Sequence, residues 1–232
     1  TVAGASVYDF DLMGGGGHLL GRQISGENAG TLQRVIAAVT GAQAVQFAVG
    51  DGNHSLAAAR KCWLEKKQRL TPEEAEQDPA RYALVELVNI HDPAIIFAPI
   101  HRVLFDTDAE LWFKEAQREL FDPKGREITL LAGEKRIKLL AKGETIGALI
   151  GNVEHFCRGY LERHGGEIDY IHGDDETVML SSSPNSCGVL LPPIEKDELF
   201  ASIENSGPFP RKSFSIGLGP DKRYYLECRK IK

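Results

Sequence analysis

The spacing of apolar residues along the first fifty positions predicts two strands, a helix and a third strand. Short β-compatible runs over 7–12 and 18–24 flank a run of four glycines, which predicts a hairpin. Apolar residues then recur at helical spacing, so we expect an amphipathic helix over 27–40. The run 44–49 is short, apolar and bounded by glycine, which predicts a buried strand.

The next part of the chain predicts two helices and two strands. After the glycine-containing turn at 50–54, apolar positions as far as Leu70 indicate a helix that should pack on the sheet, and Thr71-Pro72-Glu73-Glu74 is typical of a helix start. The β-rich runs 82–90 and 95–104 are expected to pair antiparallel across the turn between them.

The remaining half continues the alternation of helices and strands. Helices are expected over 107–121, 146–163 and 196–203, and strands over 126–142 with a break at 133–134, over 168–172, 187–191 and 223–231. No internal repeat or low-complexity linker divides the chain. We therefore expect residues 1–232 to form one mixed α/β domain, with helices packed on a mixed sheet.

Composition limits the class of protein. With 232 residues, 42% hydrophobic and 26% charged, and a net charge of −6, the chain is expected to be soluble and globular, and its acidity argues against a broad nucleic-acid surface. The four cysteines lie far apart without a Cys-x-x-Cys pair, so we expect reduced thiols and a cytoplasmic protein. No apolar run is long enough to span a membrane and no signal peptide is present, so no membrane partner is expected.

The turn Gly50-Asp51-Gly52-Asn53-His54 is the strongest candidate for a functional site. Its glycines let the backbone approach a ligand, and the N–H groups at the start of the following helix would face an anion such as phosphate. The alternative is structural, because Asp51 or Asn53 can cap the helix while Gly52 makes the turn. A capping turn does not need the imidazole of His54, which favours phosphate binding or proton transfer.

Two further strand ends carry polar residues. His101 and Arg102 lie in an apolar run, where a histidine is usually a satisfied structural residue but an adjacent arginine can clamp phosphate. His172 ends another predicted strand and is followed by Gly173 and two aspartates, which is also typical of an exposed turn before a capped helix. Common nucleotide, hydrolase and zinc-protease motifs are absent from the sequence.

Several motifs in order along the chain together resemble one family. They are the segment 47–57 around the turn, Pro99-Ile100-His101-Arg102, Tyr170-Ile171-His172-Gly173, Pro210-Arg211-Lys212-Ser213-Phe214-Ser215 and Lys222-Arg223-Tyr224-Tyr225-Leu226-Glu227. The chain thus resembles the bacterial domain-of-unknown-function family numbered ten-fifteen, over essentially its whole length. Together with the missing initial methionine, this resemblance implies the larger C-terminal part of such a protein, without an N-terminal segment.

The family's signature around the turn is in turn similar to the phosphate-binding turn of the ParB and sulfiredoxin superfamily, which includes nucleotide-dependent free-serine kinases. This chain departs from that signature because Ser55 stands where arginine is expected after His54. A kinase function therefore requires that Arg102, Arg211 or Lys212 supply the missing positive charge.

Three functions are compared. The first is a nucleotide-dependent phosphotransferase, a kinase acting on a serine-like metabolite with ATP or ADP and Mg²⁺ as cofactors. The second is a non-catalytic protein that binds a nucleotide or a phosphorylated metabolite, which Ser55 and the absent segment favour. The third is a metal-dependent hydrolase that uses histidines such as His54, His91, His101 and His172, although their spacing matches no known ligand pattern.

The phosphotransferase hypothesis assigns a role to each candidate residue. Asp51 would hold the metal or orient the acceptor, and His54 would bind phosphate or move a proton. Contacts to the nucleotide are predicted for Gly50, Gly52, Asn53, His101, Arg102, Arg211, Lys212 and Ser213. We expect Asp51, Asn53 and His54 to share one wall of a pocket with Arg102 and Lys212, because loops gather at a common sheet edge. Whether the chain forms a homodimer is left open.

Overall fold

The computed structural model describes residues 4–41 and 44–217. Contacts between residues divide the chain into two compact units, with the boundary in the sequence between Ala48 and Val49. Both helices and strands are present throughout, so the predicted mixed α/β class is confirmed. That residues 1–232 behave as one domain stays a prediction. None of the helices within the described ranges is long and apolar enough to cross a membrane.

The first unit is a hairpin followed by a helix. Strand β1 (Ala5–Asp11) pairs antiparallel with β2 (His18–Gln23) around a 3₁₀ turn, η1 (Met13–Gly15), and α1 spans Glu27–Thr40. The hairpin and the helix are therefore confirmed. None of the side chains of α1 is buried, so its amphipathic stripe has no covering element among the described residues of this unit.

The second unit is built on a six-stranded sheet in the order β5-β4-β7-β3-β6, with β8 paired to β3. Its strands are β3 (Phe97–Phe105), β4 (Phe121–Ala132), β5 (Lys135–Ala141), β6 (Glu167–His172), β7 (Cys187–Leu190) and β8 (Phe214–Ile216). Every pairing is antiparallel. The predicted strands from residue 95 to 191 are confirmed within a few residues.

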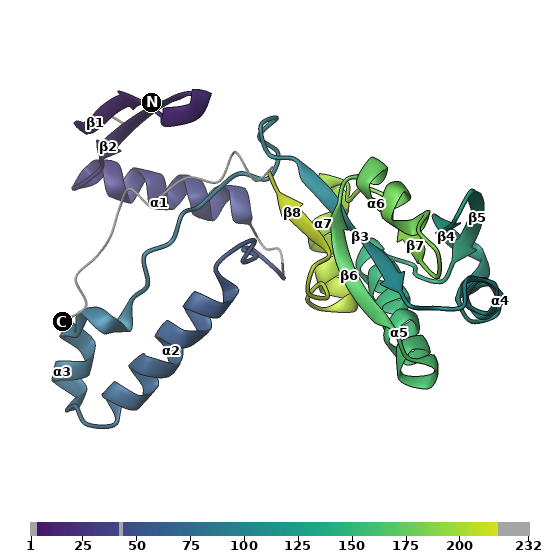
Figure 1. Cartoon of the computed structure of the whole chain (residues 1–232). Coiled ribbons are helices and arrows are strands. Elements are labelled where there is room, and N and C mark those ends of the chain that lie inside the picture. Colours follow the sequence, from purple (N-terminus) through teal and green to yellow (C-terminus); the bar gives the residue numbers. More distant parts are fainter. Residues whose placement is uncertain (1–3, 42–43, 218–232) are drawn as a thin grey trace. The chain divides into compact units, whose positions relative to one another are not determined.

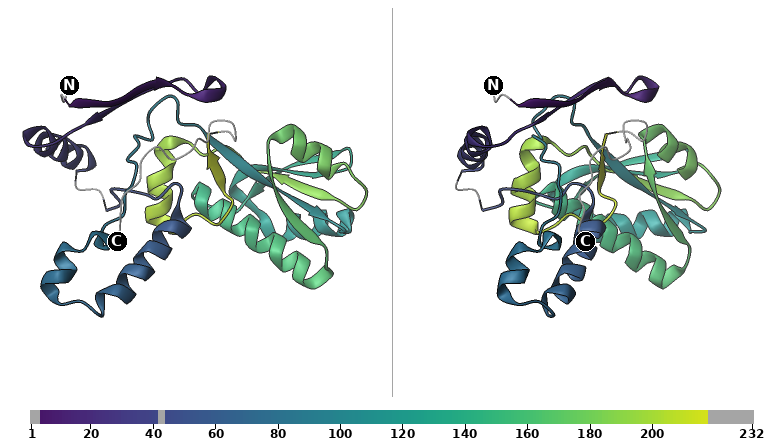
Figure 2. Two further views of the ribbon diagram at one scale, coloured as in Figure 1. Left: turned by 60° about the vertical axis from the view of Figure 1, so that its left-hand side comes forward. Right: turned by 90° about the vertical axis from the view of Figure 1, so that its left-hand side faces the viewer.

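The helices of the second unit are α2 (Asn53–Lys67), α3 (Pro72–Gln77), η2 (Pro79–Arg81, a 3₁₀ turn), α4 (Ala109–Leu120), α5 (Ile146–His164), α6 (Asp174–Ser181) and α7 (Lys196–Ser206). Two of these starts show ordinary capping chemistry: Thr71 and Glu74 form a capping box, and Thr145 accepts the N–H of Ala148. Figures 1 and 2 show α5 and α6 on opposite faces of the sheet.

The core lies between the sheet and helices α4 and α5. Trp112 of α4 is fully buried against Phe113 and against Phe156 of α5, and Leu130 of β4 is fully buried in the same cluster. Burial on this scale contributes most of the stability of a domain. The buried residues of this core all lie after position 96 in the sequence.

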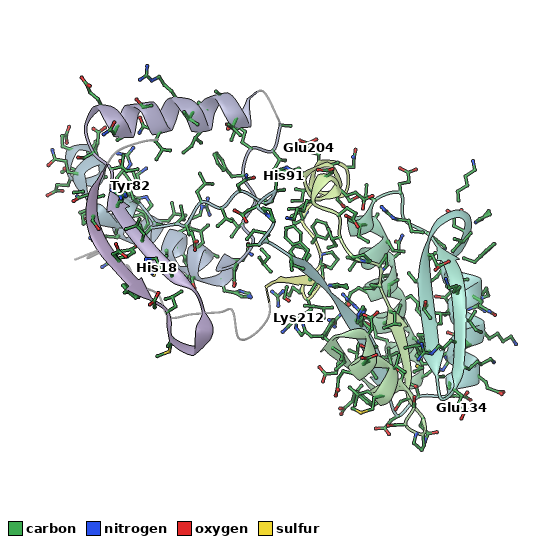
Figure 3. The ribbon with its side chains drawn as sticks, turned by 90° about the horizontal axis from the view of Figure 1, so that it is seen from above. His18, Tyr82, His91, Glu134, Glu204 and Lys212 are labelled. Carbon is green, nitrogen blue, oxygen red and sulfur yellow. The ribbon has the colours of Figure 1, made fainter. Side chains whose placement is uncertain are left out.

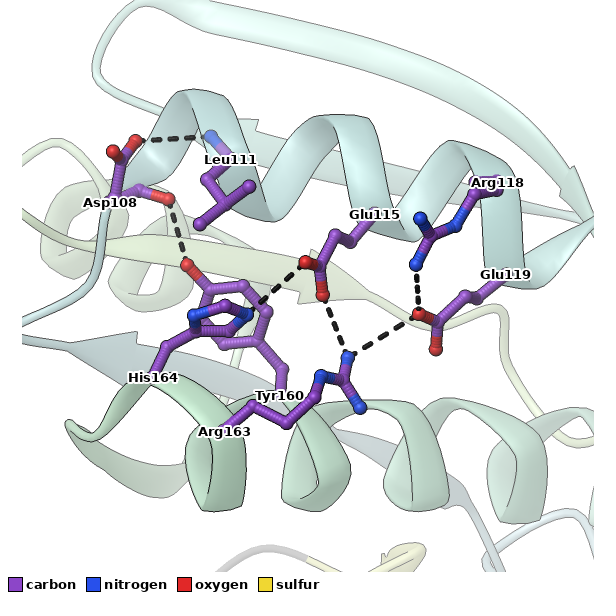
Figure 4. A network of polar contacts seen from close by, with 8 residues as sticks. All are labelled: Asp108, Leu111, Glu115, Arg118, Glu119, Tyr160, Arg163 and His164. Carbon is purple, nitrogen blue, oxygen red and sulfur yellow. Dashed lines mark hydrogen bonds and ion pairs between the residues drawn. The ribbon is translucent and has the colours of Figure 1, made fainter.

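A polar network joins the exposed edges of α4 and α5 (Figure 4). Glu115 accepts a hydrogen bond from Arg163 at 2.7 Å and lies 3.1 Å from Nε2 of His164. The Arg163 guanidinium, followed by His164, lowers the pKa of the Glu115 carboxyl. The hydroxyl of Tyr160 donates to the carbonyl of Asp108, which itself caps α4.

Two predicted strands are not formed. Residues 44–49 are irregular, and Phe47 and Val49 are 53% and 50% exposed, so this run is not a buried strand. Residues 82–89 are also irregular, and the predicted pairing of 82–90 with 95–104 is wrong. The strands that pair with β3 come from later in the chain: β6 and β7 pair with its two edges from Ile100 on, and β8 pairs with 97–99.

The expected packing of the second helix on the sheet is also wrong. Helix α2 has the predicted start and length, but none of its side chains is buried. Cys62, Cys157 and Cys187 are unpaired thiols. The predicted strand 223–231 and Cys228 lie outside the described residues.

Candidate functional site

The turn at 50–54 forms the helix start that its sequence predicts, but the strand expected before it is absent. Gly52 adopts a left-handed conformation, with φ at +78°, and its N–H donates to Oδ1 of Asp51 at 2.8 Å. Helix α2 begins at Asn53 and has no side-chain cap. The first N–H groups of a helix have no acceptor inside it, so this end carries partial positive charge.

The side chains of Asn53 and His54 do not cap the start of α2. The amide of Asn53 donates backward to the carbonyl of Val49 at 3.3 Å, and His54 is exposed. A Cβ on Gly50 would lie 2.7 Å from Cδ1 of Ile216, so the turn approaches the end of β8 closely at this point. The contact places the turn beside the strand that follows Lys212.

The second predicted cluster, Arg211-Lys212-Ser213, forms the turn before β8 (Figure 3). Arg211 and Lys212 are exposed, and Lys212 has a φ of +58°, which is rare for a residue with a side chain. Ser213 is buried: its hydroxyl donates to the carbonyl of Pro210 at 2.6 Å, and its own carbonyl accepts the N–H of Ile100. The two cations are therefore available to solvent, whereas the Ser213 side chain holds the turn.

His101 is buried in β3 and satisfied at both ring nitrogens. Its Nε2 lies 2.9 Å from Oδ1 of Asp174 at the start of α6, and its Nδ1 accepts the N–H of Leu191 at 3.1 Å. This pattern requires a neutral ring with its proton on Nε2. Burial lowers the pKa of His101, while Asp174 acts in the opposite direction.

Arg102 is also fully buried, and it faces α5. Its Nε donates to Oε2 of Glu154 at 3.3 Å, and its guanidinium lies 5.2 Å from the ring centroid of Tyr170. Glu154 in turn accepts from the hydroxyl of Tyr170 and from Arg158, each at 2.6 Å. The Nη2 of Arg102 has no hydrogen-bond partner among the described residues.

The hypothesis that His101 and Arg102 act together on one ligand conflicts with this geometry. Successive residues of a strand point to opposite faces of the sheet. His101 accordingly reaches α6, and Arg102 reaches α5 on the other face. Both side chains have partners inside the fold, and their binding of a ligand stays a prediction, as does a common pocket wall for Arg102, Lys212 and His54.

Other parts of the surface do not add to the predicted site. Two hollows, of about 440 and 380 Å³, contain none of the predicted residues. The first is lined by Asp106, Thr107, Asp108, Ala109, Glu110 and Asn185, and the second by Arg118, Glu119, Leu120, Lys142, Asn152, His155 and Phe156. Among the described residues, no three His, Cys, Asp or Glu side chains gather as metal ligands. This finding gives the metal-dependent hydrolase no support.

The family model for the Protein of unknown function (DUF1015) matches residues 2–166. The chain belongs to this family. The match contains the motifs around the turn and at Pro99-Ile100-His101-Arg102, whereas the later motifs at 170–173, 210–215 and 222–227 lie beyond it. No curated protein matches the chain in sequence.

One solved structure shares the fold of this DUF1015 member. SbnI with C-terminal truncation from Staphylococcus aureus matches with a TM-score of 0.50 and 12% sequence identity. The alignment covers 85% of this chain and 78% of the SbnI chain. At this identity the likeness shows the fold alone.

Sequence reasoning missed Glu154, Arg158 and Asp174 as partners of the candidate residues. Glu154 and Arg158 are four residues apart on a predicted helix, a spacing that indicates an ion pair on one face. Nothing local to either sequence segment connects Glu154 with Arg102, which lies 52 residues earlier. Asp174 was seen only as part of a helix start.

The buried neutral histidine makes stability depend on pH. Because the folded-state pKa of His101 is lowered, its neutral form stabilises the fold above the ordinary pKa of about 6.5, and this contribution is lost as the pH falls. We expect the free energy of unfolding, measured by urea titration from about pH 8 to about pH 5, to decrease across that range. The variant His101→Asn should show a smaller decrease, and an unchanged slope would assign the effect to other histidines.

Proposed function

We propose that this DUF1015 protein binds a phosphate-containing small molecule, a nucleotide or a phosphorylated metabolite, at the turn 50–54. The observation that carries the proposal is the uncapped start of α2 behind a left-handed Gly52. Such a helix start offers several N–H donors to one phosphate group, and the helix dipole adds to the attraction. The exposed imidazole of His54 stands next to these donors.

Arg211 and Lys212 would supply the positive charge that Ser55 does not. Both are exposed, and the approach of Gly50 to Ile216 links the turn to the strand that follows them. Arg102 is less suited to this role because its guanidinium is buried beside Glu154. In this proposal the ligand would contact the helix start and receive positive charge from Arg211 and Lys212.

The burial of Arg102 favours binding over phosphoryl transfer, because transfer needs cations at the developing charge. A kinase-like reaction with a serine-like acceptor is the finer proposal, and the resemblance of the turn to the ParB and sulfiredoxin superfamily supports it. Asp51 suits Mg²⁺ in that case, since Mg²⁺ is held by one or two carboxylates together with the phosphates of ATP or ADP. His54 would then accept the acceptor's proton.

The variant His54→Ala tests the site. We expect ATP, ADP or inorganic phosphate to bind about 10-fold to 100-fold more weakly, as the loss of a charge-assisted hydrogen bond predicts. The melting temperature should hardly change, because His54 is exposed and contributes little packing. Calorimetric titration gives the affinity, and the shift in melting temperature with ligand provides a second measurement.

His164→Ala is the matched control. His164 lies 3.1 Å from Glu115 at the end of α5 and 4.6 Å from the Tyr160 ring, so its loss should lower stability modestly and leave phosphate binding unchanged. A large drop in stability for His54→Ala with binding intact would instead make His54 structural. Release of inorganic phosphate or ADP from ATP, absent in Asp51→Asn, would separate transfer from binding.

A further inference from the structure

One of the two surface hollows lies among the ends of three elements of the compact core and contains no residue of the turn 50–54. Its lining consists of Arg118, Glu119 and Leu120 at the end of α4, Lys142 directly after β5, and Asn152, His155 and Phe156 on α5. Pockets for small molecules have volumes of about 300 to 1,000 Å³. With about 380 Å³, this hollow can hold a small ligand.

Backbone contacts hold the lining in place. The N–H of Lys142 donates to the carbonyl of Leu120 at 2.8 Å, and the side-chain amide of Asn152 donates to the carbonyl of Lys142 at 3.0 Å. The chain then passes directly against α5, because a Cβ on Gly143 would clash with the backbone of Leu149. Position 142 is therefore tied to both helices.

The side chains of the hollow offer positive charge and hydrogen-bond donors. Lys142 and His155 are exposed, and neither side chain has a hydrogen bond or an ion pair among the described residues. Arg118 is 71% exposed and uses only its Nη2, which lies 2.8 Å from Glu119 (Figure 4). Glu119 is also 3.4 Å from Arg163, so its charge is compensated from outside the hollow as well.

We propose that this hollow binds a small dicarboxylate. Lys142 and Arg118 come from different elements, so their charges suit two carboxylates that lie apart in one molecule. His155 adds a hydrogen-bond donor between α5 and the ligand. Leu120 and Phe156 also line the hollow, and they provide an apolar surface for the short carbon chain that joins the carboxylates.

A phosphate group suits this hollow less well than two carboxylates. Phosphate sites are typically built from backbone N–H groups that converge at a helix N-terminus. The helix end in this lining is the C-terminal end of α4, which carries partial negative charge and disfavours a concentrated double charge. The N–H of Lys142 already donates to Leu120 and is not available to a phosphate.

Titration of the whole chain with succinate tests the proposal. Exposed cations bind weakly, so calorimetry from about 0.1 to about 30 mM at constant ionic strength brackets the expected dissociation constant of about 1 mM. Proton NMR locates the ligand, because succinate should shift the ring resonances of His155, which the variant His155→Gln identifies. Acetate, with one carboxylate, should bind at least about 10-fold more weakly.

The variant Lys142→Glu should weaken succinate binding by about 10-fold or more, because it replaces an attraction with a repulsion. Lys142→Arg keeps the charge and should bind within about threefold of the natural chain. Lys67→Glu is the matched control, since it makes the same change of charge at an exposed residue of α2 that does not line the hollow. Circular dichroism confirms that each variant is folded.

Succinate that leaves the His155 resonances unchanged would overturn the proposal, as would equal binding by Lys142→Glu and Lys67→Glu. Acetate or inorganic phosphate that binds as tightly as succinate at this hollow would overturn the choice of a dicarboxylate. The outcome is independent of phosphate binding at the turn 50–54, because these variants change no residue of that turn. The variant His54→Ala should accordingly bind succinate as the natural chain does.

Discussion

Replacing Trp112 with alanine is expected to lower the free energy of unfolding by about 3–5 kcal/mol, the cost of removing a large aromatic side chain from a packed core. Trp112 is fully buried, with Phe113 and Phe156 at centroid distances of 5.5 and 6.0 Å. The remaining cavity can be filled only if α4 moves closer to α5 and the sheet. Urea denaturation followed by far-ultraviolet circular dichroism measures the loss.

The second tryptophan is the control for this prediction. Trp63 lies on α2, which has no buried side chain, so Trp63→Ala should cost about 1 kcal/mol or less. The loss of stability for Trp112→Phe should lie between those of the two alanine variants. Phenylalanine keeps part of the packing and removes an indole N–H that has no partner among the described residues. Equal losses for Trp112→Ala and Trp63→Ala would show that α2 packs as firmly as α4.

Sequence patterns located the elements of the compact core well, because burial there follows the apolar period. The expected helix over 146–163 is observed as Ile146–His164, and its buried residues include Leu149, Val153 and Phe156 at helical spacing. The two strands around the predicted break at 133–134 are also observed, as β4 and β5. Each of these elements has a neighbour that covers its apolar side.

The two failed strands show what a local pattern cannot supply. Residues 44–49 and 82–90 have strand-forming side chains, but a strand also needs a partner strand, which local composition does not specify. The exposure of Phe47, Val49 and Val85 records that missing partner. The sequence pattern therefore indicates a preference for the strand conformation but does not indicate which strand would pair with it.

The candidate site was predictable only where its geometry is local. The start of α2 at Asn53 follows from the glycine-rich turn, and the structure agrees. The role of Arg102 depends on Glu154, which lies 52 residues away, and no short motif contains that information. The opposite directions of His101 and Arg102 could have been inferred from the alternation of side chains along a strand.

Replacing Arg102 with alanine tests its structural role. We expect a loss of about 3–5 kcal/mol, because breaking a buried ion pair leaves a charge with insufficient compensation. Glu154 is only 14% exposed and would keep Arg158 and Tyr170, so a value near the lower end is expected. Thermal and urea unfolding of the whole chain measure the change.

Arg158→Ala is the matched control, since Arg158 contacts the same carboxylate but is 59% exposed. Exposed ion pairs contribute about 0–1 kcal/mol, so this variant should be almost as stable as the natural chain. The double variant Arg102→Met with Glu154→Leu should recover much of the stability, because it removes both buried charges at similar volume. If Arg102→Ala instead has the same free energy of unfolding as the natural chain but no longer binds inorganic phosphate, Arg102 belongs to the ligand site. Its contact with Glu154 must then open when the ligand binds.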